Sequence, residues 1–304
     1  MSDNEPIDAP GAVLISADPT GQSDIRYEHI CDLTEGDYQR YNDVYKALYD
    51  VLFANTFAYF RGSVKVFHTV WTAANKALGA NEIRPTQNPD GYVLWTTQLR
   101  SVALTLCLSL CYHQEQTYQE ICEKHGTNSE AHQAAKTVFG EVYDAYPGYR
   151  YMYALRNVMV HDAMDAIALE STTALDTNRQ PIGMWDLQLD REFLSQSKRV
   201  NERMKAEFAS LTENPSLPAL FFEIAQPMAD ANVELLTILH PDLTDVCRNV
   251  MEFDELFGGR PGTRALAHNV SPELKAGMQI GYSSWPNEMI AFARNYQLGQ
   301  DIRR

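Results

Sequence analysis

Residues Tyr149–His161 have the sequence YRYMYALRNVMVH, and their pattern predicts a helix with two different faces. Successive residues of a helix turn by about 100°, which brings Met152, Leu155 and Met159 to within about 60° of one another. We expect this apolar stripe to face the protein core. The polar side chains on the opposite side of the helix are Arg150, Tyr153, Asn157 and His161.

Arg156 lies about 140° from His161 around this predicted helix, so its guanidinium must reach round the axis to meet the imidazole. On an ordinary surface helix, such a pair would be a solvated histidine and an arginine bound to a carboxylate. The alternative is a site for metal-free RNA cleavage. A histidine can take the proton of a ribose 2′-hydroxyl, and a guanidinium can bind the adjacent phosphate through a bidentate fork.

The end of this segment, Arg156-Asn157-x-x-x-His161, resembles the Arg-x4–6-His signature of the HEPN superfamily, in which a polar residue commonly follows the arginine. The wider string, Tyr149–Asn157, is similar to stand-alone HEPN-like proteins in which an aromatic-Arg-aromatic run precedes Leu-Arg-Asn. The likeness continues past the motif, because the following elements come in the order of those proteins. These elements are a predicted hairpin at 167–189, a helical segment at 191–211 and a helix at 219–240.

The resemblance covers about residues 90–250 and implies an all-helical bundle that forms a homodimer, with the two motif helices facing across a cleft. It also implies metal-independent endoribonuclease activity of the kind found in toxins and phage-defence effectors. RNA would be the substrate, no cofactor or metal would be needed, and an antitoxin or activating protein would be a further partner. Arg156 and His161 would form the catalytic pair, and Asn157 would support them.

We also expect residues near the motif to bind the RNA, because aromatic rings stack on unpaired bases and arginine adds positive charge. The expected substrate-binding residues are Tyr149, Arg150 and Tyr153. Asp162, directly after His161, would hold an imidazolium but repel a phosphate.

Two other interpretations stay open. Many HEPN domains are catalytically silent dimerisation or interaction modules, and the formal net charge of −15, without a compensating basic stripe, favours such a module. The other is a zinc-binding regulator that uses Cys107 and Cys111, four residues apart on one predicted helix face. Their leucine-rich surroundings favour core packing instead.

The remaining sequence predicts a mostly α fold: a helical bundle of HEPN type with one β-hairpin inserted after the motif helix and extra C-terminal helices. Helical periodicity is expected at 35–56, 59–79, 94–124, 128–143, 149–162, 191–211, 219–239 and 242–257, with a further helix beginning at Ser271. The hairpin has its turn at Asp176–Pro181. Trp185 should pack onto the bundle, because strand alternation turns one face inward.

We expect three parts along the chain. Residues 1–34 form an acidic, loosely ordered arm, whose apolar island Ala12–Ile15 could add one strand to a sheet. Residues 35–257 form the HEPN-like helical domain. Residues 258–304 form a loop, mobile over 258–271 because of its glycines, and a C-terminal helical extension.

Composition limits the function further. Hydrophobic residues make up 45% of the 304 residues and charged residues 21%, which excludes global disorder. The sequence lacks Gly-x-Gly-x-x-Gly, a phosphate-binding Gly-Lys-Ser/Thr loop, Gly-x-Ser-x-Gly and His-Glu-x-x-His. It therefore carries no motif for nucleotide-dependent chemistry or for a zincin protease. The acidic start, an odd count of five cysteines and an apolar run of only ten residues (Val102–Cys111) predict a soluble cytoplasmic protein that does not bind membranes.

Overall fold

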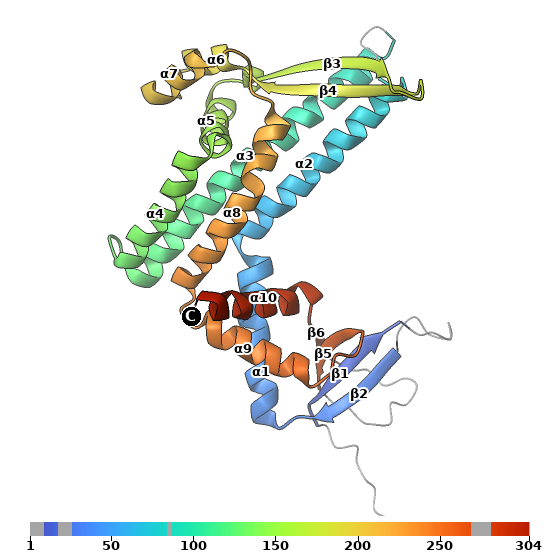
Figure 1. Cartoon of the computed structure of the whole chain (residues 1–304), viewed down its shortest axis with the longest axis vertical. Helices are drawn as coiled ribbons and strands as arrows, with labels where there is room; N and C mark the ends of the chain where they lie inside the picture. The colour runs from blue at the N-terminus through green and yellow to red at the C-terminus, as the bar shows by residue number, and fades with distance from the viewer. Residues whose placement is uncertain (1–8, 18–25, 84–86, 269–280, 304) are drawn as a thin grey trace, which may run out of the picture. The chain divides into compact units, whose positions relative to one another are not determined.

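The computed structural model describes residues 9–17, 26–83, 87–268 and 281–303. This part of the chain is mostly helical, as predicted (Figure 1). The chain divides into two compact units, one formed by residues 1–55 with 240–304 and the other by residues 56–239. These boundaries differ from those expected near residues 34 and 257, because both ends of the chain contribute to one unit.

The first unit contains a four-stranded antiparallel sheet with the strand order β2-β1-β5-β6. The strands are β1 (Gly11–Ser16), β2 (Arg26–Asp32), β5 (Thr263–Ala267) and β6 (Tyr282–Ser284). Its helices are α1 (Glu35–Tyr49), a π-helical turn η1 (Asp50–Ala54), α9 (Leu243–Glu255) and α10 (Asn287–Arg303).

Two expectations for this unit need correction. The N-terminal arm is not loosely ordered over β1 and β2, because Ala12, Val13 and Leu14 are buried in a central strand. The mobile loop expected at 258–271 is wrong over β5, whose residues pair with β1. The loop glycines just before it do adopt positive φ. Residues 269–271 and the helix start expected at Ser271 lie outside the described residues.

The second unit is a helical bundle that carries a hairpin and two short helices (Figure 1). The long helices are α2 (Thr56–Gly79), α3 (Pro89–His125), α4 (Glu130–Ala145), α5 (Pro147–His161) and α8 (Leu217–Leu239). The others are η2 (Met164–Ala166), α6 (Arg191–Gln196) and α7 (Glu202–Ser210). The helical segment predicted at 191–211 is therefore two helices, because Asn201 caps a second start.

The predicted hairpin and its tryptophan are confirmed. Strands β3 (Ile167–Leu175) and β4 (Pro181–Leu189) pair antiparallel around the expected turn. Trp185 is 1% exposed, and its ring lies 5.0 Å from that of Tyr92 on α3. The Trp71 indole of α2 donates a hydrogen bond to the Trp185 carbonyl, which fixes the hairpin onto the bundle.

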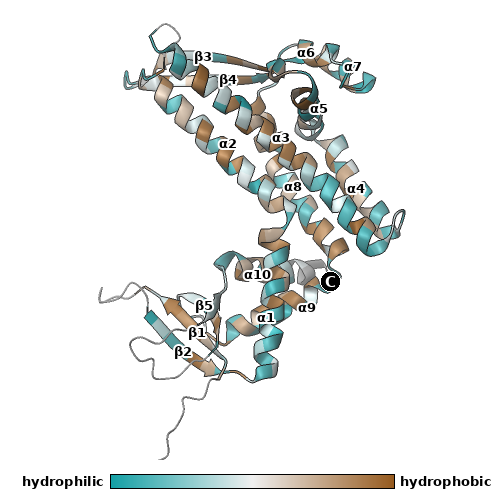
Figure 2. Cartoon of the chain, turned by 180° about the vertical axis from the view of Figure 1, so that it is seen from behind, coloured by the Kyte–Doolittle hydropathy of each residue, from teal (hydrophilic) through white to brown (hydrophobic). Residues whose placement is uncertain are grey.

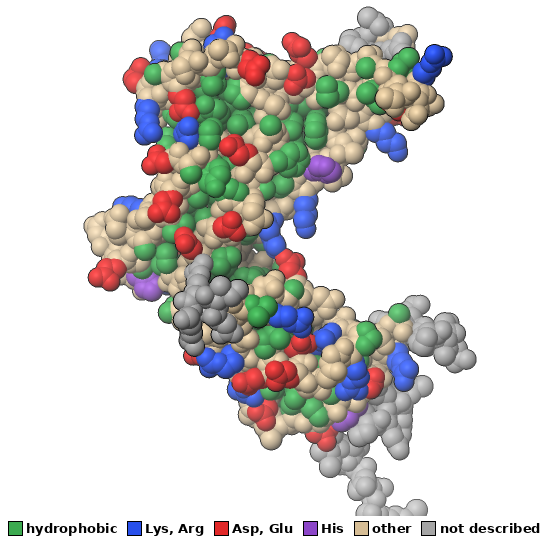
Figure 3. All heavy atoms as spheres, in the orientation of Figure 1, with side chains coloured by type: hydrophobic (Ala, Val, Ile, Leu, Met, Phe, Trp, Pro, Cys, Tyr) green, Lys and Arg blue, Asp and Glu red, His purple; other side chains and the backbone are tan. Residues whose placement is uncertain are grey.

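Helix α3 runs through this unit and contacts α2, α4, α5 and α8. Among the described helices it alone is long and apolar enough to cross a membrane, a test that the core helix of a soluble protein also passes. Figure 2 shows hydrophobic residues at intervals along both α2 and α3. Figure 3 shows hydrophobic side chains gathered over the helices of this unit on the face in view, with acidic side chains scattered among them.

Candidate functional site

Helix α5 carries the motif, and its start is fixed by two residues that suit a tight helix entry. Pro147 occupies the first turn, where a missing N–H costs nothing. Gly148 follows because α8 passes very close: a Cβ there would lie 2.6 Å from the Leu220 carbonyl oxygen. The Gly148 N–H donates to a Glu223 carboxylate oxygen at 3.1 Å. The start of the motif helix therefore packs closely against α8.

Tyr149 was expected to bind substrate, and its position contradicts this. Its side chain is 1% exposed and its hydroxyl donates to Gln114 Oε1 at 2.9 Å. Burial raises the pKa of this phenol well above its ordinary value. The helix buries a wider arc than its Met/Leu stripe suggested, since α3, α4 and α8 all contact it. Tyr149 is therefore a core residue.

Arg150 was also expected to bind RNA, but its guanidinium is already used. Its Nε and Nη2 donate to Glu207 Oε1 at 3.0 and 2.7 Å, and its Nη1 donates to the Tyr143 carbonyl at 3.2 Å. Glu207, on α7, also accepts a hydrogen bond from Tyr151 at 2.9 Å. The hydrogen bond to Glu207 raises the pKa of Arg150. This pair joins α5 to α7 and leaves no free fork for a phosphate.

Arg156 has different surroundings, and Asn157 orients it. Its Nη1 donates to Asn157 Oδ1 at 3.0 Å, and its Nη2 lies 3.4 Å from Glu115 Oε1 on α3. Its Nε is buried without a hydrogen-bond partner in the described part of the chain. Tyr153, one turn earlier, is half-buried, and burial raises its pKa. The structure therefore places the side chains of Arg156 and Asn157 in contact.

His161 is the last residue of α5, and its side chain is exposed. No hydrogen bond joins its ring to Arg156 within the described residues. Asp162 is held elsewhere: it accepts from Ser197 Oγ at 2.6 Å and lies 3.4 Å from Arg199 Nε. The Ser197 hydrogen bond lowers the pKa of Asp162. The carboxylate next to His161 thus has its own partners in the turn between α6 and α7.

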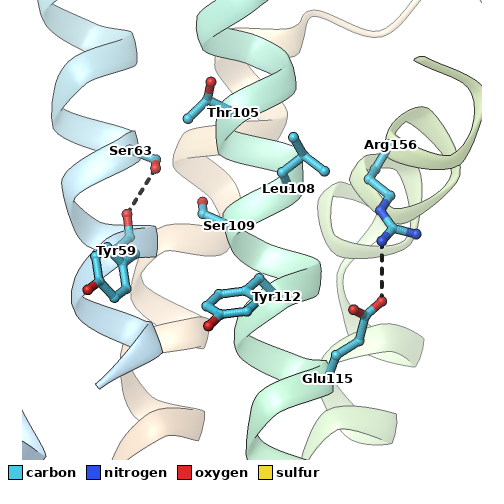
Figure 4. A pocket seen from close by; sticks show the side chains of 8 residues that line it. All are labelled: Tyr59, Ser63, Thr105, Leu108, Ser109, Tyr112, Glu115 and Arg156. Atoms are coloured by element: carbon cyan, nitrogen blue, oxygen red, sulfur yellow. Dashed lines mark hydrogen bonds and ion pairs between the residues drawn. The ribbon is translucent and has the colours of Figure 1, made fainter. Parts of the chain in front are cut away.

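A groove lies beside Arg156, between α2 and α3 (Figure 4). Its volume is about 410 Å³. The residues that line it are Tyr59, Ser63, Thr105, Leu108, Ser109, Tyr112, Glu115 and Arg156. Arg156 and Glu115 are the charged members of this lining. The groove can hold a ligand with one anionic group and an apolar or aromatic remainder.

The cysteines near this site have the properties of core residues. Cys107 and Cys111 are buried, and burial raises the pKa of Cys111 to about 12. A thiol must lose its proton to bind zinc, so this environment disfavours a metal site. Within the described ranges, no group of three or more His, Cys, Asp or Glu side chains could hold a metal ion.

Comparison with family models, curated proteins and solved structures finds no match to this chain.

Glu115, Tyr59 and Tyr112 line the groove but were not predicted as site residues. A signal was present for the α3 residues, because one row of positions spaced three or four residues apart has a single charged member, Glu115. The row consists of Leu94, Thr97, Ser101, Thr105, Leu108, Tyr112 and Glu115, and the structure shows all of them exposed. Tyr59 lies on another helix, so only the packing of α2 against α3 brings it to the same groove.

Proposed function

We propose that this chain is a HEPN-like, metal-independent endoribonuclease that acts as a homodimer, in the manner of a toxin or an antiviral-defence effector. The observation that supports this most directly is Arg156, which Asn157 orients at the edge of a groove, with an exposed His161 at the end of the same helix. Among the motif-helix residues expected to act on RNA, these have no structural role that excludes it.

The chemistry needs these groups alone. His161 removes the proton from a ribose 2′-hydroxyl, whose oxygen attacks the adjacent phosphorus while the bond to the 5′-oxygen breaks. The departing 5′-oxygen takes a proton from water, and the imidazolium returns its proton to water. The products are a 2′,3′-cyclic phosphate and a 5′-hydroxyl. Arg156 binds the non-bridging oxygens and stabilises the charge that develops on them. Asn157 holds the guanidinium through its Oδ1.

Exposed apolar side chains outside the groove beside Arg156 support the homodimer. They are Val93 and Leu94 on α3 and Val160 on α5. A two-fold interface would remove such side chains from water. Val160 directly precedes His161 on the motif helix, so an interface that covers it would bring both copies of α5 near the axis. A Val160→Asp substitution should then give monomers in sedimentation.

One observation favours the rival function, a catalytically silent interaction module. Arg156 already faces Glu115, and the groove has no second cation among its lining residues. The test is to incubate purified wild-type protein with mixed RNA in EDTA and to analyse the new ends. Cleavage that leaves 2′,3′-cyclic phosphates supports the nuclease. Inert dimeric protein, or cleavage that EDTA stops, contradicts it.

A further inference from the structure

The groove beside Arg156 continues along the α2/α3 surface. A second hollow of about 300 Å³ shares Tyr59, Ser63 and Thr105 with the first and extends to Val66 and Val102. We call the groove and this second hollow together the furrow. Hydroxyl-bearing and apolar side chains make up nearly all of its lining. Its charged residues are the Arg156 and Glu115 pair at one end. The furrow is thus an apolar, aromatic surface with a guanidinium at its edge.

Two exposed tyrosines line the groove that Arg156 borders. Tyr59 is 62% exposed and Tyr112 is 46% exposed. In Figure 4 their rings lie at the same level on neighbouring helices, and the Tyr112 ring extends from α3 toward α2. Neither ring contacts another aromatic ring in the described part of the chain. Their faces are therefore open to a planar ligand, and stacking on exposed aromatic rings is how unpaired bases are held.

The Arg156 guanidinium, at another edge of the same groove, is poorly satisfied. The Arg156–Glu115 distance of 3.4 Å is long for a charge-assisted hydrogen bond, which is usually 2.7–2.9 Å. Glu115 is half-exposed, so water screens the pair and its loss costs little. Only one oxygen of Glu115 contacts Arg156, whereas the two non-bridging oxygens of an RNA phosphate can accept from the guanidinium in a bidentate manner. A phosphate can therefore replace the carboxylate at Arg156.

We propose that this furrow binds single-stranded RNA, with an unpaired base stacked against Tyr59 and Tyr112 and its phosphate on Arg156 in place of Glu115. This rests on the proposed function, since it assumes that Arg156 receives an RNA phosphate. A second copy of the chain could also cover the tyrosines. RNA is favoured at this end because an apolar protein surface would leave the Arg156 donors unmatched, whereas a nucleotide supplies both a ring and an anion.

The experiment measures binding apart from cleavage. A fluorescently labelled ten-nucleotide oligouridine is titrated with His161→Ala protein, and its anisotropy gives Kd. Adding Tyr59→Ala or Tyr112→Ala should weaken binding roughly tenfold each, because a stacked base contributes about that much. Tyr112→Phe should retain the affinity. Glu115→Gln should tighten binding several-fold, since the competing charge is removed.

Matched controls lie outside the furrow. Tyr282→Ala removes an exposed tyrosine of the first unit, and Glu120→Gln removes an exposed carboxylate of α3 that pairs with Lys124. Neither should change Kd. The proposal is overturned if the oligouridine does not bind, or if Tyr59→Ala and Tyr112→Ala leave its Kd unchanged. Tyrosine variants that become monomers in sedimentation also overturn it, because a second copy then occupies the furrow. If the wild-type protein cuts no RNA but oligouridine binding depends on Tyr59 and Tyr112, the RNA-binding proposal holds and the proposed nuclease function is refuted.

Discussion

The two arginines of α5 lie six residues apart and have different surroundings. The Arg150 side chain is 15% exposed and donates to Glu207 at 2.7 Å and to a main-chain carbonyl. The Arg156 side chain is 24% exposed, has a long contact with Glu115 and keeps an Nε without a partner among the described residues. The first half of the helix is built into the bundle, and the second half faces a groove.

The difference shows what a motif alone leaves undecided. By position around the axis, Arg150 lies on the same side of the helix as Asn157 and His161, whereas Arg156 must reach round to them. The carboxylate of Glu207, 57 residues further along the chain, binds the Arg150 guanidinium and makes it unavailable to a ligand. In the C-terminal half of α5, Arg156 Nη2 has only a long contact with Glu115, so we expect any RNA contact there. The following predictions test this division of the helix.

The largest effect is expected at the second half of α5. His161→Ala and Arg156→Ala should each lower the rate of RNA cleavage at least about a hundredfold, the usual cost of losing a general base or an oxyanion stabiliser. Arg156→Lys should restore little, because a point charge cannot reproduce a bidentate fork. Single-turnover cleavage in EDTA measures this. Urea denaturation should show the free energy of unfolding of His161→Ala unchanged within about 0.5 kcal/mol. Normal cleavage by His161→Ala would refute the assignment.

The next effect should appear at the first half and concern stability. Arg150→Ala leaves Glu207 largely buried without its cation, so we expect the free energy of unfolding to fall by roughly 2–3 kcal/mol. Residual folded protein should still cleave RNA. Glu207→Ala should destabilise similarly, and the double variant should lose less than the sum of the two single changes. A stable Arg150→Ala protein with greatly weakened RNA binding would instead make Arg150 a substrate-binding residue.

Local patterns in the sequence predicted most of the second unit. Alternating Trp185, Leu187 and Leu189 opposite a turn-rich segment defined the hairpin, and the structure places all three in the core. The pairing of β1 with β5 could not be predicted in this way. These strands are about 250 residues apart, and nothing local in either one identifies its partner. Strand pairing at such separation depends on the tertiary fold.

The candidate site was predictable only where it is local. Asn157 is adjacent to Arg156 in the chain, so their hydrogen bond follows from the motif. Glu115 and Tyr59 reach the same groove because α3 packs against both α5 and α2. A helical wheel for α5 also could not show that three neighbouring helices enclose it, and Tyr149 was misassigned for that reason.

Tyr149→Phe should have a smaller effect that separates packing from recognition. The change removes the buried hydroxyl that donates to Gln114 and keeps the ring in the core. We expect the free energy of unfolding to fall by about 1 kcal/mol. The rate of RNA cleavage at saturating protein should not change. A large loss of cleavage without a loss of stability would mean that Tyr149 does bind the substrate.

The smallest expected effect is a pH dependence that belongs to the first half of α5. Burial alone would favour the protonated Glu207 carboxyl, but hydrogen bonds from Arg150 and Tyr151 hold its pKa below the ordinary value. The folded state therefore binds this proton less tightly than the unfolded state does. The resulting stabilisation is complete above the ordinary glutamate pKa of about 4.3 and is lost as pH falls through the folded-state value.

Urea unfolding of wild-type protein and Glu207→Gln at pH 6 and pH 3.5 tests this, because the other carboxylates titrate in both proteins. Wild type should lose more stability on acidification than Glu207→Gln. Equal losses would mean that the Arg150–Glu207 pair does not control the charge of this carboxylate, and the contrast between the two arginines would then lack an electrostatic basis.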